Sequence, residues 1–82
     1  MKKILYFTNP ATCAPCRTLG PIMDSLSGEL HIEKVNTSEN MELTVQYGVR
    51  AIPTAILVVD GTEQKRFQGV KSLEFIRDFY NN

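Results

Sequence analysis

The sequence predicts an α/β fold in the order β-α-β-α-β-β-α, with four strands in one mixed sheet and helices on both faces. Apolar runs of strand length alternate with stretches of helical spacing, which is typical of βαβ units. Near the end of the chain, Asp60-Gly61 separates two strand-like stretches, and this dipeptide favours a hairpin turn. The βαβ half requires a parallel strand pair, whereas the hairpin adds an antiparallel one. The 82 residues fit one domain, residues 1–82, with a small core.

The first half of the chain predicts a strand, a helix and a second strand. Lys3–Thr8 is short and apolar, so we expect a buried strand. Residues 14–27 carry an apolar stripe, and Gly28 stands where helices commonly end. The stripe consists of Leu19, Ile22, Met23 and Leu26. Leu30–Asn36 alternates between apolar and polar residues, which predicts a half-buried strand.

A short second helix and a loop are expected next. Thr37-Ser38 supplies an N-cap for this helix, which should end before Gly48. Arg50–Pro53 then forms a loop that leads into the third strand.

The last third of the chain predicts the hairpin and a final helix. Thr54–Val59 is rich in β-branched residues, which favours a strand. Thr62–Gln68 is alternating and charged, so we expect its partner strand at an edge of the sheet. Ser72 can cap the final helix, whose apolar stripe consists of Leu73, Ile76, Phe79 and Tyr80.

The charge and hydropathy patterns exclude several classes of protein. Acidic and basic residues balance to a formal net charge of zero and are scattered, so we expect no nucleic-acid partner. No apolar run approaches the roughly 20 residues that a membrane span needs. Met1-Lys2-Lys3 resembles the start of a signal peptide, but the apolar run after it stops at Thr8, short of the required length of about 7–15 residues. We therefore expect a cytoplasmic monomer with no membrane association.

The only two cysteines, Cys13 and Cys16, form a C-x-x-C motif between the first strand and the first helix. At a helix N-terminus, unpaired N–H groups and the helix dipole favour a thiolate, so the pKa of a thiol falls below its usual value of about 8.5. Cys13 should be the exposed nucleophile, and Cys16, one turn further in, the buried resolving cysteine. Pro15 lacks an N–H and therefore fits the first helical turn.

Two other interpretations of the cysteine pair remain open. A zinc site needs four ligands, and the chain offers the two cysteines and His31, so a metal site would have to be completed by a dimer. The cysteines could also be inert core residues. In a reducing cytosol, a lone pair is more often catalytic or metal-binding than a permanent crosslink.

Several motifs together resemble the thioredoxin family. They are Cys13-Ala14-Pro15-Cys16, Pro21 in the same helix, Gly48-Val49-Arg50-Ala51-Ile52-Pro53-Thr54, Asp60-Gly61 and Gly69. The resemblance runs from Lys3 to the C-terminus and lacks the extra N-terminal strand and helix of full-length thioredoxins.

The resemblance implies a thioredoxin-like fold and a thiol–disulfide oxidoreductase that reduces protein disulfides through a Cys13–Cys16 dithiol–disulfide cycle. It implies no bound cofactor, because electrons would come from NADPH through a thioredoxin-reductase-like donor and pass to disulfide-containing target proteins. One alternative is a glutaredoxin-like reductase that uses glutathione, although Gly69-Val70 offers one glycine where that family has two. Another alternative is a thioredoxin-fold binding module without turnover.

The resemblance also implies roles for individual residues. Pro53 would be a cis-proline that faces the two cysteines, and the Ile52 backbone would pair with an extended substrate peptide. Other residues would border the same substrate-binding groove, namely Thr12, Ala14, Pro15, Gly69 and Val70.

Three positions depart from the family pattern or change its meaning. Thr12 replaces the usual tryptophan before the first cysteine, so the exposed aromatic platform is missing. Phe7 falls at the family's buried aspartate, which lies beneath the second cysteine and helps to move a proton to or from it. Water or Tyr6 would then carry that proton. Lys34 matches the lysine partner of that aspartate, and it either contacts a cysteine or holds its amine in solvent.

Overall fold

The computed structural model describes residues 1–82 and contains four strands and three helices. They are β1 (Lys2–Thr8), α1 (Ala14–Leu26), β2 (Ile32–Asn36), α2 (Met41–Gln46), β3 (Thr54–Val59), β4 (Thr62–Gln68) and α3 (Leu73–Asn81). The strands form one sheet in the order β2-β1-β3-β4. β1 runs parallel to β2, whereas β1–β3 and β3–β4 are antiparallel pairs. The predicted element order and mixed sheet are therefore confirmed.

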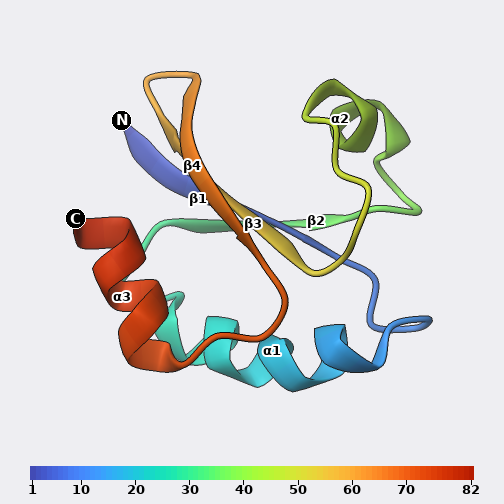
Figure 1. Ribbon diagram of the computed structural model, residues 1–82, viewed down its shortest axis with the longest axis horizontal. Coiled ribbons are helices and arrows are strands. Elements are labelled where there is room, and N and C mark those ends of the chain that lie inside the picture. The colour runs from blue at the N-terminus through green and yellow to red at the C-terminus, as the bar shows by residue number, and fades with distance from the viewer.

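Helices cover both faces of the sheet, as the sequence predicted. α1 and α3 lie on one face, and α2 lies on the other (Figure 1). Each face has its own apolar cluster, and the central strand β1 contributes to both. Ile4 and Tyr6 pack with residues of α1 and α3, whereas Leu5 and Phe7 pack on the α2 side with Val35. This division follows from the two-residue period of a strand, which sends successive side chains to opposite faces.

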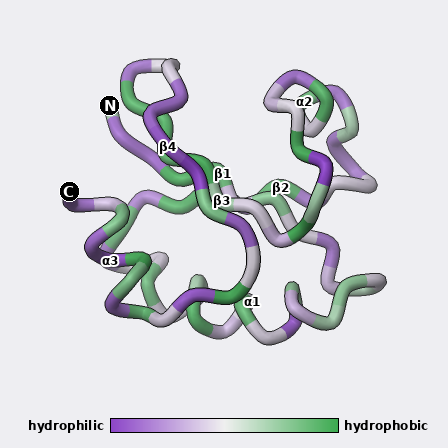
Figure 2. The backbone as a smooth tube through the Cα atoms, viewed as in Figure 1, coloured by the Kyte–Doolittle hydropathy of each residue, from purple (hydrophilic) through white to green (hydrophobic).

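The β3–β4 hairpin turns at the predicted dipeptide. Asp60 and Gly61 have φ values of 52° and 84°, and two positive φ angles in succession are what a two-residue hairpin turn of the favoured kind requires. β4 lies at the edge of the sheet and is largely hydrophilic (Figure 2). Such polar edge strands are disfavoured as templates for pairing with other chains.

One local expectation was wrong. Asn40 caps α2 in place of Thr37-Ser38, because its side-chain oxygen accepts the Leu43 N–H at 3.1 Å. The Ser38 N–H instead donates to the Asn36 side chain, which forms a turn ahead of the helix.

α1 ends just before Gly28, as expected. Its last residue is Leu26, and the C-cap residue Ser27 has a φ of −65°. Gly28 follows this cap without a positive φ.

None of the three helices has the length and apolar character that crossing a bilayer would require.

Candidate active site

The two cysteines lie at the N-terminus of α1 and are joined by a disulfide, with their Cα atoms 5.2 Å apart. Cys13 is the N-cap residue, and its Sγ accepts the N–H of Cys16 at 3.2 Å. The side chain of a cap residue normally takes up one of the free N–H groups of the first turn, and here a sulfur does so. Cys13 was expected to be exposed, but it is largely buried and retains 9% of its surface. It is still more accessible than Cys16, which retains 1%.

Local sequence explains why the motif sits at the helix start. Pro15 occupies the first turn, where its missing N–H removes no helical hydrogen bond. The loop ahead of Cys13 turns at Asn9, whose carbonyl oxygen accepts the Thr12 N–H at 3.1 Å. Arg17 then holds this loop against α1, because its Nη1 donates to the Pro10 carbonyl oxygen at 2.7 Å.

The loop before β3 forms a wall opposite Cys13. The Ile52–Pro53 peptide bond is cis, as expected. The Ile52 carbonyl oxygen lies 3.6 Å from the Cys13 Sγ, although the two residues are 39 positions apart. Gly69, just after β4, contacts this loop. Its N–H donates to the Pro53 carbonyl oxygen at 3.0 Å, and its own φ is 82°. The segment of Ile52 and Pro53 therefore contacts both the Cys13 sulfur and the end of β4.

Several side chains close in sequence to Cys13, Pro53 and Gly69 are exposed. They belong to Thr12, Ala14, Pro15, Ala51 and Val70, and Val70 keeps 42% of its surface. The Ile52 N–H donates to no protein acceptor. A free main-chain donor of this kind can pair with an extended peptide in the manner of strand addition.

The structure corrects the residue expected beneath Cys16. Phe7 packs on the opposite face of the sheet, with its ring centroid 6.0 Å from that of Tyr47. Its neighbours in β1, Tyr6 and Thr8, share a cavity of about 270 Å³ with Cys16. The expected position was wrong by one residue, and a shift of one residue along a strand moves a side chain to the opposite face of the sheet. The alternation of Ile4, Tyr6 and Thr8 was the sequence signal that could have identified Thr8.

Lys34 also lines this cavity. Tyr6 and Lys34 are direct partners in the parallel register of β1 and β2, so they share one face of the sheet. The Lys34 Nζ lies 3.4 Å from the Asp24 Oδ1, and both side chains are more than half exposed. Lys34 thus holds its amine at the surface, paired with an α1 carboxylate that sequence reasoning did not single out.

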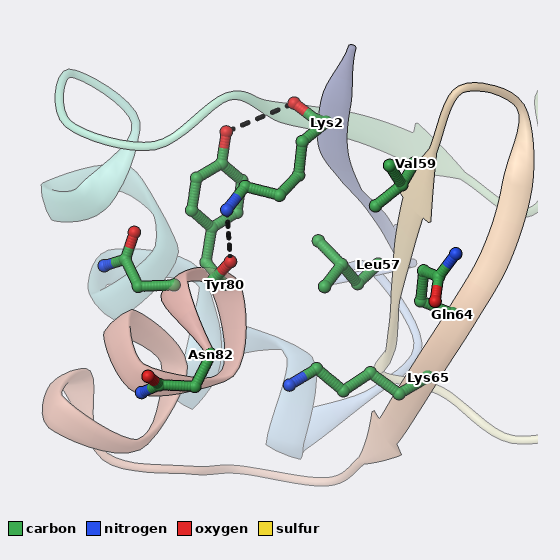
Figure 3. A pocket seen from close by; sticks show the side chains of 8 residues that line it. Lys2, Leu57, Val59, Gln64, Lys65, Tyr80 and Asn82 are labelled. Carbon is green, nitrogen blue, oxygen red and sulfur yellow. Dashed lines mark hydrogen bonds between the residues drawn. The ribbon is translucent and has the colours of Figure 1, made fainter.

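A larger cavity, of about 480 Å³, contains no residue of the cysteine site. It lies between α3 and the β3–β4 hairpin (Figure 3). Two of its lining residues, Lys2 and Tyr80, are hydrogen-bonded to each other. The Lys2 Nζ donates to the Tyr80 carbonyl oxygen at 2.8 Å, and the Tyr80 hydroxyl donates to the Lys2 carbonyl oxygen at 3.1 Å. No cysteine lines this larger cavity, so the thiol chemistry of the chain takes place outside it.

The structure also bears on the metal-site interpretation. Nowhere does it bring three or more His, Cys, Asp or Glu side chains together in a way that could hold a metal ion.

Comparisons with known proteins agree with this site. The sequence model of the thioredoxin family matches residues 2–82. Thioredoxin from Chlamydia pneumoniae is 43% identical over 72 residues, which cover 84% of this chain and 71% of that protein. Thioredoxin from Rickettsia bellii is 34% identical over 74 residues, which cover 85% of this chain and 70% of that protein.

Solved structures give the same result. A single-residue mutant of thioredoxin from Halobacterium salinarum superposes with a TM-score of 0.89 at 27% identity, over 98% of this chain and 72% of that one. Fasciola hepatica thioredoxin superposes with a TM-score of 0.88 at 29% identity, over 98% of this chain and 78% of that one. The family has reductases and disulfide-containing proteins as partners in general. The matches together with the Cys13–Cys16 pair show that the chain belongs to the thioredoxin family and is a thiol–disulfide oxidoreductase.

Proposed function

We propose that the protein reduces disulfide bonds in other proteins, with Cys13 as the attacking thiolate and Cys16 as the resolving thiol. The observation that carries this proposal is the placement of Cys13. Its sulfur accepts a main-chain N–H at the start of α1, and its chain neighbours Thr12 and Ala14 are exposed. A thiolate is the species that attacks a disulfide, and a donor of this kind stabilises it.

The reaction divides into two exchanges. The Cys13 thiolate attacks one sulfur of the target disulfide, which forms a mixed disulfide and releases the other target sulfur as a thiolate. Cys16 then loses its proton and attacks the Cys13 Sγ. This closes the Cys13–Cys16 disulfide and releases the second target thiolate. Two electrons pass from the dithiol to the target, and the two target thiolates take up protons.

The target would bind as an extended segment along the Ile52 backbone. The Ile52 N–H that donates to no protein group supports this role, as does the proximity of Ile52 to Cys13. We propose that Thr12, Ala14, Pro15, Gly69 and Val70 form the rim of the binding groove beside the cis-proline Pro53, where they would contact side chains of the target. The missing tryptophan at position 12 leaves a flatter rim, so we expect a target preference different from that of proteins with an aromatic there.

The electron donor is proposed to be NADPH, acting through a thioredoxin-reductase-like enzyme, with no cofactor bound to this chain. We also propose that residues 1–82 form a single domain that works as a cytoplasmic monomer.

An insulin-reduction assay with two arms tests the electron donor. One arm contains NADPH and thioredoxin reductase, and the other contains glutathione with glutathione reductase. Turnover only in the second arm would favour the glutaredoxin-like alternative, and no turnover with chemically reduced protein would favour a binding module.

The roles of the two cysteines are tested by substitution. Cys13→Ser should abolish insulin reduction, because no thiolate remains at the accessible position. Cys16→Ser should still attack the target but should accumulate a mixed disulfide through Cys13, which intact-mass measurement detects. Normal turnover by Cys16→Ser would contradict the two-cysteine mechanism.

A further inference from the structure

Resolution of the mixed disulfide requires a proton to leave a buried group. Cys16 must become a thiolate before it attacks Cys13, yet only 1% of Cys16 is exposed. This requirement rests on the proposed function, in which Cys16 is the resolving thiol.

Thr8 is the unusual polar group near Cys16. It lies at the end of β1, retains 2% of its surface, and its Oγ1 is a buried side-chain oxygen without a hydrogen-bond partner in the protein. The other buried threonine, Thr54, donates its hydroxyl to the Ala51 carbonyl oxygen. Burying a hydroxyl without a partner is unfavourable, so Thr8 is expected to use a partner within the cavity that it lines.

The cavity itself connects Cys16 to the surface. It is lined by Thr8, Cys16 and Tyr6 in its interior and by the exposed Lys34–Asp24 pair at its mouth. Its volume of about 270 Å³ accommodates water, and a water molecule needs two to four polar partners of the kind present here. A hydroxyl can accept one hydrogen bond while it donates another, so it can hand a proton along a chain of water.

We propose that the Thr8 hydroxyl, together with water in this cavity, relays the proton between Cys16 and solvent. The Cys16 S–H bond breaks, its electron pair stays on the sulfur, and the proton passes to a water held by Thr8. From there it leaves past Lys34 and Asp24. The freed electron pair forms the bond to the Cys13 Sγ. Thr8 is a positioning residue in this scheme, because it acts through water.

The test compares Thr8→Val with Thr8→Ser. Val keeps the branched shape but removes the hydroxyl, whereas Ser keeps the hydroxyl. A Cys13 mixed disulfide with a chromophoric aryl thiol is formed, and release of that thiol on Cys16 attack is followed in a stopped-flow instrument between pH 6 and 9. Thr8→Val should resolve about tenfold more slowly at pH 7, with the pH profile moved upward, and Thr8→Ser should restore the rate.

The alkylation rate of Cys13 provides the control for a structural effect. It should be the same in Thr8→Val as in the unmutated protein, since the hydroxyl makes no hydrogen bond within the protein that could hold α1 in place. Unmutated resolution rates in Thr8→Val across the pH range would overturn the relay. A rate lost in Tyr6→Phe but kept in Thr8→Val would overturn the assignment to Thr8. An unmutated protein that never resolves the mixed disulfide would instead overturn the proposed function.

A second variant keeps the inference testable if Thr8→Val does not fold. Gly20 lines the same cavity, four residues after Cys16 on one face of α1, and a Cβ there would meet no atom within 4 Å. Gly20→Leu should fill the cavity with apolar atoms while it improves helix propensity. We expect slower resolution at pH 7 and an unchanged Cys13 alkylation rate. An unchanged resolution rate in a folded Gly20→Leu protein would count against a water path through the cavity.

Discussion

Cys13 has two main-chain groups at its sulfur with opposite effects. The Cys16 N–H donates to the Sγ at 3.2 Å and stabilises a thiolate, whereas the Ile52 carbonyl oxygen at 3.6 Å favours the protonated thiol. A hydrogen bond to a charged group contributes about 1.5–3 kcal/mol, and the N-terminus of a helix adds about 0.3–1 kcal/mol in favour of the anion. The S–H group is a weak donor, so its hydrogen bond to the Ile52 carbonyl stabilises the protonated thiol by less. The thiolate is therefore expected to prevail.

We predict that iodoacetamide alkylates Cys13 of the reduced protein with a rate midpoint below that of a free thiol, about pH 8.5. The reason is the donated N–H, which lowers the pH at which the thiolate forms. Mass spectrometry of peptides assigns the modified cysteine, and mercaptoethanol under the same conditions is the reference. A midpoint at or above the reference would remove the basis for a nucleophilic Cys13.

Two connections of β4 matter at the level of the elements, namely its turn from β3 and its contact with the end of α2. The β3–β4 turn holds Gly61 at a φ of 84°, a region that an L-residue enters at a cost. Arg66 in β4 donates from Nη2 to the Tyr47 carbonyl oxygen at 2.7 Å, which ties the edge strand to the end of α2. This tie lies just ahead of the loop that carries Ile52 and Pro53, so β4 helps to position the wall opposite Cys13.

We predict that Gly61→Ala lowers the free energy of unfolding by about 1–2 kcal/mol, because alanine must adopt the left-handed conformation. Gly28→Ala is the matched control, since Gly28 has no positive φ and a Cβ there meets no atom within 4 Å. That change should stay within about 0.5 kcal/mol of the unmutated protein. Urea unfolding of the oxidised proteins measures both values. Equal losses in the two variants would show that the turn conformation does not carry the cost.

Two arginine–carboxylate pairs lie on the surface of the molecule, and one of them joins two segments of the fold. Arg77 in α3 donates to Glu29 in the α1–β2 loop, and Arg66 donates to Glu63 within β4. In each case the hydrogen bond from arginine lowers the pKa of the carboxyl below 4.5. A lowered folded-state pKa contributes stability that is present above the unfolded value and is lost as the pH falls through the folded value.

Acid should therefore weaken the fold below about pH 4.5, and Glu63→Gln should reduce this dependence. The amide has no charge to lose, so the variant should lose less stability than the unmutated protein between pH 7 and pH 3. Both partners are partly exposed, so the effect should be small and should shrink further in 1 M salt. Urea midpoints at the two pH values provide the measurement. Equal losses in the two proteins would contradict a role for the Glu63–Arg66 pair.

Much of the candidate site could be predicted from local sequence, and the rest could not. The C-x-x-C at a strand–helix junction placed Cys13 at a helix cap, and Asp60-Gly61 located the hairpin. The residue beneath Cys16 was misplaced, because its identity depends on which face of β1 each side chain takes. Phe7 and Thr8 are adjacent in the chain, yet they lie on opposite faces of the sheet.

The sequence by itself determined the order of the elements, the start of α1 at the cysteines and the turn between β3 and β4. These features depend on periodicity, caps and turn residues, which act over a few positions. The family resemblance anticipated that the loop of Ile52 and Pro53 faces Cys13, 39 residues away. Only the tertiary structure decided that Thr8, Cys16 and Lys34 line one cavity. Contacts between residues distant in sequence depend on how the helices pack on each face of the sheet, and no local pattern encodes that geometry.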